Sequence, residues 1–111
     1  MADCIFDKII AGQIPSALVY QDETVFAFKD INPKAPTHIL IVPKKHIASF
    51  NDLTKEDLPL MGHLLEAAKT IASQQGLKAY KLVINTGAEA GQVVMHLHIH
   101  LLAGKKFESP V

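Results

Sequence analysis

The chain has 111 residues, of which 49% are hydrophobic, and its eleven basic residues balance its eleven acidic residues. This length fits one domain, residues 1–111, and the apolar content is too high for a disordered chain. Zero formal net charge argues against a general nucleic-acid-binding protein, which usually presents a basic face. A small anionic ligand needs only a local site, so neutrality does not exclude one.

Cys4 is the single cysteine, which excludes an internal disulfide and fits a reducing compartment. We expect it to be a buried apolar residue of the first helix. The chain shows no charged leader followed by a long apolar run, and no apolar run approaches the ~20 residues that span a bilayer. We therefore expect a cytoplasmic protein without a membrane partner.

The first predicted elements are a short helix and three strands. Asp3 is placed to cap the helix and Gly12 to end it. Strands are predicted over residues 17–20, 24–30 and 37–43, and the third is almost continuously apolar, which is typical of a central strand. The apolar residues at helical spacing in the first helix are Ile5, Phe6, Ile9 and Ile10.

A long amphipathic helix is predicted to begin at Thr54 or Asp57 and to end near Gly76. Pro59 favours a cap at Asp57, because a proline within the first turn removes no needed hydrogen-bond donor.

The remaining predicted strands cover residues 80–85 and 92–102, separated by a glycine-containing loop, and the tail 105–111 is expected to be irregular. Five strands with one short and one long helix indicate an α+β domain. Most links between strands are too short for a crossover, so we expect a mainly antiparallel five-stranded sheet.

Three histidines alternate along the last predicted strand. His96, His98 and His100 would share one face, with Cα atoms about 7 Å apart. Crowded imidazoles repel one another when charged, so each is pushed toward neutrality near pH 7. The long helix should cover the other face, formed by Met95, Leu97, Ile99 and Leu101.

A neutral imidazole can bind a metal or act as a nucleophile. A metal site could take two ligands from His-x-His and a third from His38, but no acidic partner is evident beside them. Alternatively, His98 could attack phosphorus and form a nucleotidyl-imidazole that water then hydrolyses. The glycines of the loop 87–91 would let backbone N–H groups approach phosphate oxygens.

The segment 91–102, Gly-Gln followed by His-Leu-His-Ile-His-Leu-Leu, resembles the signature of the histidine-triad (HIT) family. Residues 30–38 and 39–46 are similar to the middle of the Hint branch of that family, and the likeness extends over about residues 3–106. The resemblance implies that His98 is the nucleophile and that Asp30 accepts the ribose hydroxyls. It implies three supporting histidines, His38, His96 and His100. It also implies a purine clamp of Ile5, Phe6, Ile9, Phe28, Ile31 and Leu40, and a phosphate surround of Asn85, Gly91, Gln92 and Val93.

The resemblance further implies a homodimer whose sheets join into one ten-stranded sheet, and hydrolysis of purine nucleoside 5′-phosphoramidates without a metal or other cofactor. His100 favours hydrolysis, because transferase relatives carry Gln there. Val93 departs from the Ser that is frequent in the family, which weakens expected help to the leaving group. A non-catalytic purine-nucleotide-binding adaptor and a metal-dependent hydrolase remain the alternatives. His46, beside two lysines, is expected to be solvated.

Overall fold

The computed structural model describes residues 4–111, so the predicted cap Asp3 lies outside the described residues. The first helix, α1, spans Ile5–Ile10 and ends before Gly12, as predicted. Cys4 is its N-cap and is only half-buried, so the expectation of a buried residue inside the helix is wrong. Its Sγ lies 3.4 Å from Nδ1 of His96.

The five strands form one antiparallel sheet in the order β1-β2-β3-β5-β4. This confirms the predicted α+β architecture, and the first three strands lie within one residue of their predicted bounds. β3 lies at the centre of the sheet, where both of its faces are covered. Its nearly continuous apolar sequence predicts this position, because a strand covered on both faces needs apolar side chains on both. The strands are β1 (Leu18–Gln21), β2 (Val25–Lys29), β3 (Thr37–Pro43), β4 (Lys81–Val83) and β5 (Ile99–Ala103).

The last strand is predicted over residues 92–102, and the first half of this prediction is wrong, because β5 begins only at Ile99. The backbone turns before this point: the N–H of His96 donates to the carbonyl of Val94, two residues back. A local hydrogen bond of this kind cannot form in an extended strand. As a result Met95, expected on the helix-covered face, is 46% exposed, whereas Leu97 and the β5 residues behind it are buried as predicted.

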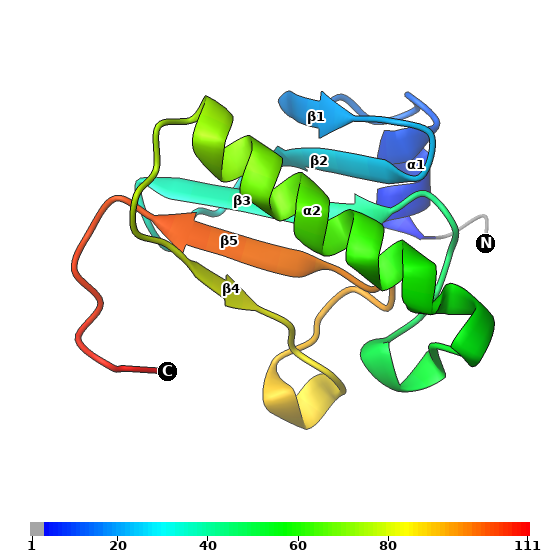
Figure 1. Ribbon diagram of the computed structural model, residues 1–111. Helices are drawn as coiled ribbons and strands as arrows, with labels where there is room; N and C mark the ends of the chain where they lie inside the picture. Colours follow the sequence, from blue (N-terminus) through cyan, green and yellow to red (C-terminus); the bar gives the residue numbers. More distant parts are fainter. Residues whose placement is uncertain (1–3) are drawn as a thin grey trace.

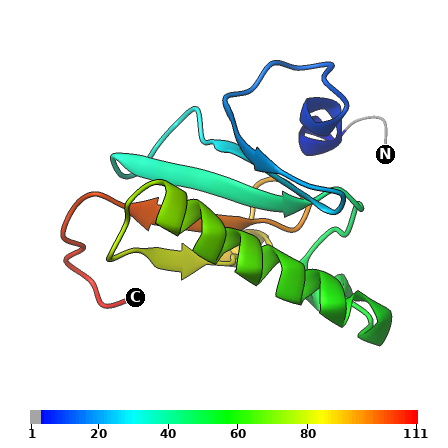
Figure 2. The same ribbon diagram turned by 45° about the horizontal axis from the view of Figure 1, so that its top comes forward.

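The two helices cover opposite faces of the sheet (Figures 1 and 2). The long helix α2 (Leu58–Gln74) crosses one face, where Leu64 and Ile71 pack over Ile39 and Ile41 of β3. The short helix α1 packs against one end of the other face, where Phe6 and Ile9 contact Phe28, Leu40 and Val42. Alternation along β3 thus divides its side chains between the helices.

Asp57 occupies the N-cap position of α2, and Pro59 lies in the first turn, as predicted. The Asp57 side chain makes no capping hydrogen bond to α2, however, and instead forms a capping box with Thr54 around the preceding turn, Lys55–Asp57. The Asp57 carboxylate accepts hydrogen bonds from the Lys45 ammonium (2.7 Å) and the Thr54 N–H (3.0 Å). These contacts lower the pKa of Asp57 to about 2. Within residues 4–111, no helix combines the length and apolarity needed to cross a membrane.

Candidate active site

Four histidines meet on the face of the sheet that α2 does not cover. His38 comes from β3, His100 from the paired strand β5, and His96 and His98 from the turn that leads into β5. His38, His96 and His98 are buried and His100 is half-buried. The His98 and His100 rings are 4.9 Å apart, and the His38 and His100 rings are 5.1 Å apart. The predicted sharing of one face by the triad His96, His98 and His100 therefore holds, although among these three only His100 lies in a strand.

The ring of His98 is fixed by a backbone carbonyl. Its Nδ1 lies 2.7 Å from the carbonyl oxygen of His96. A carbonyl only accepts hydrogen bonds, so Nδ1 carries the proton and Nε2 keeps the lone pair. Burial lowers the pKa of His98 and so favours the neutral ring. The result is an oriented imidazole with an unprotonated Nε2, which is the form that can act as a nucleophile.

A directed chain of hydrogen bonds ends at His100. The backbone N–H of Lys34 donates to Nδ1 of His38 at 3.0 Å, so neutral His38 carries its proton on Nε2. That nitrogen lies 2.9 Å from Nδ1 of His100 and 3.4 Å from Asp30 Oδ2. His100 accepts on Nδ1, which leaves its own proton on Nε2. Burial, and the neighbouring His98 and His38, lower the pKa of His100 to about 4.

The side chains predicted to hold a purine fall into two groups. Phe6, Ile9, Phe28 and Leu40 form one buried cluster, and the Phe6 ring lies edge-on to the His98 ring at 5.2 Å. Ile5, however, is 44% exposed and Ile31 is 88% exposed, so these two lie outside the cluster. An apolar wall is therefore already assembled beside His98.

The loop before the triad is held in shape by two amide side chains. Asn85 donates to the carbonyl of Ala90 at 2.8 Å. Gln92 is buried; it accepts from the Gly87 N–H at 2.9 Å and donates to the Ala48 carbonyl at 2.7 Å. Gly91 has a φ of 97°, a conformation that side-chain-bearing residues rarely adopt. In this structure, both predicted ligand residues Asn85 and Gln92 bind the protein's own backbone, while Val93 is 89% exposed.

The geometry agrees with the comparisons with known proteins. The family described as "Scavenger mRNA decapping enzyme C-term binding" matches residues 3–111. An uncharacterised HIT-like protein of Synechocystis is 50% identical over 109 residues, which cover 97% of this chain and 96% of that protein. The chain belongs to the HIT family.

Two further relatives of this HIT protein carry functional names. A protein of Escherichia coli K12 named purine nucleoside phosphoramidase is 47% identical over 105 residues, which cover 93% of this chain and 88% of that protein. A solved structure titled as a HIT family hydrolase from Clostridium thermocellum has a TM-score of 0.96 and 42% identity, with 100% and 98% of the two chains covered. The HIT domain is therefore of a kind found in nucleotide hydrolases.

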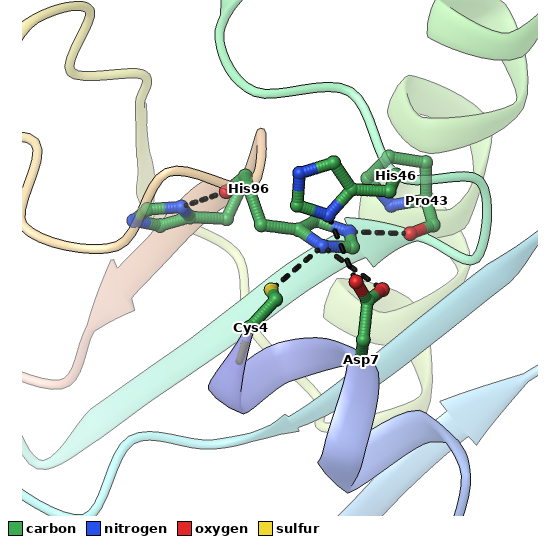
Figure 3. Close-up of polar contacts among 6 residues, drawn as sticks. Cys4, Asp7, Pro43, His46 and His96 are labelled. Carbon is green, nitrogen blue, oxygen red and sulfur yellow. Dashed lines mark hydrogen bonds and ion pairs between the residues drawn. The ribbon is translucent and has the colours of Figure 1, made fainter. Parts of the chain in front are cut away.

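The first triad histidine belongs to a second polar cluster that the sequence did not reveal. Nε2 of His96 donates to the carbonyl of Pro43 at 2.8 Å, and its Nδ1 lies 3.4 Å from both Cys4 Sγ and Asp7 Oδ1 (Figure 3). Nδ1 of His46 lies 2.9 Å from Asp7 Oδ2, and the His46 ring is only partly exposed. The expectation that His46 is solvated is thus wrong, because an acid of α1 covers it. The one available signal was the spacing of Cys4 and Asp7, one helical turn apart.

Two groups of side chains in residues 4–111 have donor atoms close enough to share a cation. One contains Cys4, Asp7, His46 and His96, and the other contains Asp30, His38 and His100; within each, the donor atoms lie within 4.8 Å of one another. Sulfur, carboxylate and imidazole donors are all ligand types that Zn²⁺ accepts. His98 belongs to neither group, so neither His-x-His pair of the triad supplies two ligands to one group, whereas the expected third ligand, His38, does lie in a group and has an acid, Asp30, beside it. That the HIT domain needs no metal stays a prediction.

Proposed function

We propose that this HIT protein hydrolyses purine nucleoside 5′-phosphoramidates at the α-phosphorus through a nucleotidyl intermediate on His98. The observation that carries the proposal is the 2.7 Å contact between His98 Nδ1 and the His96 carbonyl, combined with burial that lowers the pKa of His98. Together they leave Nε2 as a neutral, directed nucleophile. The name of the E. coli relative supports the substrate class.

In the first step, Nε2 of His98 forms a bond to phosphorus while the P–N bond breaks. The departing amine takes the bonding electron pair and one proton. The phosphate brings negative charge beside the His38–His100 pair and favours its protonated form, so the pair takes up one proton from solvent when the substrate binds, and His100 Nε2 then donates a proton to the amine. The His96 carbonyl meanwhile stabilises the positive charge that develops on the His98 ring.

In the second step, a water oxygen attacks phosphorus and the bond to Nε2 of His98 breaks. The water's proton returns to the His38–His100 pair, which restores the starting state and releases a nucleoside monophosphate. Splitting one displacement into two lets the same imidazole serve as nucleophile and then as leaving group.

The remaining predicted residues position the nucleotide. We assign the ribose hydroxyls to Asp30, since a carboxylate can accept from two adjacent donors. The purine would lie against the apolar cluster of Phe6, Ile9, Phe28 and Leu40. Backbone N–H groups of the loop 87–93 would contact the phosphate, in the shape that Asn85 and Gln92 maintain.

Hydrolysis of an adenosine 5′-phosphoramidate by the wild type and by His98→Ala tests this function. We expect the variant to lose at least about 100-fold in kcat. His63→Ala is the matched control, because His63 is exposed on α2, and it should retain wild-type turnover. Assays with and without a metal chelator test the alternative of a metal-dependent hydrolase, which would lose its activity when the metal is removed. Nucleotide binding without turnover would favour the adaptor instead.

We also propose that two copies pair through β4 to give a ten-stranded sheet. β4 pairs with only one neighbour, so its other edge carries backbone groups that a second copy could bind. Exposed apolar side chains lie on β4 and on α2, namely Leu82, Leu58 and Leu65. Sedimentation of the wild type at dimer mass, and of Leu82→Glu at monomer mass, would agree with this pairing; a monomeric wild type would contradict it.

A further inference from the structure

Helix α1 contacts the rest of the site through two polar residues on one side of the helix. Cys4 and Asp7 are one turn apart, and both point toward the paired rings of His46 and His96 (Figure 3). Because Nε2 of His96 donates to Pro43, Nδ1 of the neutral ring can accept the S–H of Cys4. The Asp7 carboxylate accepts the Nδ1–H of His46 at 2.9 Å. The contact between Asp7 and His46 is shorter than that between Cys4 and His96, and it is charge-assisted, so it is the stronger of the two.

The turn that carries the nucleophile is held separately, by the segment 43–48 that follows β3. The carbonyls of this segment accept hydrogen bonds from the turn: Pro43 from the His96 ring at 2.8 Å and Ile47 from the Leu97 N–H at 2.7 Å. Ala48 accepts from the Gln92 amide at 2.7 Å. None of these three bonds involves α1. The orientation of His98 by the His96 carbonyl should therefore survive a loosening of α1.

We infer that Asp7 is a positioning residue that latches α1 to His46 and thereby sets the Phe6 side of the purine pocket. Phe6 immediately precedes Asp7 and packs edge-on against both Phe28 (5.4 Å) and His98 (5.2 Å). A helix of six residues has little stability of its own, so its position depends on such tertiary contacts. This inference rests on the proposed function, because it assigns the pocket beside Phe6 to a purine.

The latch predicts a division between binding and chemistry. Loss of Asp7 should weaken purine binding, since Phe6 and Ile9 lie on the released helix. Chemistry at saturating substrate should change little, since the segment 43–48 still holds the turn that orients His98. A general loss of folded protein would have the opposite effect: it would lower apparent kcat and leave KM unchanged.

The experiment compares the wild type with Asp7→Ala, Asp7→Asn and the control Glu23→Gln, which neutralises an exposed acid in the β1–β2 turn. For each we would measure AMP affinity by calorimetry, kcat and KM for an adenosine phosphoramidate, and amide exchange of the peptide 4–16. We expect Asp7→Ala to raise the AMP Kd and KM about tenfold, to keep kcat within about threefold, and to speed exchange in α1. Asp7→Asn keeps one oxygen that can accept from His46, so it should lie between Asp7→Ala and the wild type.

Unchanged AMP affinity and unchanged exchange in Asp7→Ala would overturn the latch, as would a fall in kcat at constant KM. Metal content of the purified proteins supplies a third criterion: equimolar zinc in the wild type that Asp7→Ala lacks would mean that an ion, rather than the direct bond, joins α1 to His46. Affinity and exchange need no turnover. Suppose that the wild type shows no turnover while Asp7→Ala still exchanges amides faster in α1 and binds AMP more weakly than the wild type. That result would contradict the proposed reaction alone. A wild type that does not bind AMP would contradict both inferences.

Discussion

His38 and His100, 62 residues apart in the chain, are joined ring to ring by a 2.9 Å hydrogen bond between Nε2 and Nδ1. The direction of this bond is set from outside the pair, because the Lys34 N–H occupies the other nitrogen of His38. The neutral pair therefore carries a proton on Nε2 of His100.

Removal of His38 should impair proton transfer while leaving nucleotide affinity intact. His38→Ala leaves Nδ1 of His100 without its donor, so the ring can adopt the other tautomer. We expect kcat to fall about 100-fold with KM within about threefold, which steady-state kinetics would measure. His63→Ala serves as the control, and a His38→Ala effect confined to KM would contradict the role of the pair.

Removal of the Asp30 carboxylate should weaken substrate binding only when the substrate carries ribose hydroxyls. Asp30→Ala removes charge-assisted hydrogen bonds worth about 1.5–3 kcal/mol, so KM for a ribonucleotide substrate should rise by about tenfold or more. A 2′,3′-dideoxy substrate should show the same weak KM with wild type and variant alike, because it has no hydroxyl to lose. If the variant discriminated between the two sugars as well as the wild type does, the assignment would be incorrect.

The buried histidines should make the fold sensitive to mild acid. Burial lowers the pKa of His38, His96 and His98 below 6.5, and that of His100 falls to about 4. Between pH 6.5 and about 4 the unfolded chain thus binds more protons than the native protein, so the free energy of unfolding falls as pH falls. The urea midpoint should be lower at pH 5 than at pH 7.5, by less in His100→Gln. Equal midpoints would show that these rings are not held neutral.

Substitution of Gly104 by alanine should lower the free energy of unfolding more than substitution of Gly12, although both glycines have positive φ (95° and 79°). An alanine Cβ at Gly104 would lie 2.9 Å from Cβ of Pro36, whereas at Gly12 it would meet no atom within 4 Å. Gly12→Ala should cost about 1–2 kcal/mol from backbone strain. Gly104→Ala should add about 1–3 kcal/mol from overpacking. Thermal or urea unfolding measures the difference; equal losses would contradict the close contact with Pro36.

Most of the fold could be predicted because local signals and packing agree. The run of apolar residues in β3 favours a central strand, and Pro59, two residues after Asp57, favours a helix that begins just after Asp57; the chain adopts both. The sequence before β5 misled because alternating apolar residues and histidines resemble a strand. There, the buried Gln92 amide and the bond from Leu97 to Ile47 draw the backbone into a turn. Such bonds depend on a segment more than 40 residues away, which no local pattern records.

The candidate active site was likewise predictable only in part. The alternation of His96, His98 and His100 was visible in the sequence, and their shared face holds. The contact of Asp7 with His46 was not, because it joins residues 39 positions apart and each reads locally as a surface charge. Ile31 lies in an exposed loop outside the buried cluster, and its contact with a purine stays a prediction.

The central claim is tested most directly by rapid acid-free quenching of the protein with an adenosine 5′-phosphoramidate, followed by peptide mass spectrometry. The account predicts an adenylyl group on the peptide that contains His98, formed within one turnover and absent from His98→Ala. An adenylyl group on another residue, or full turnover by His98→Ala, would contradict it.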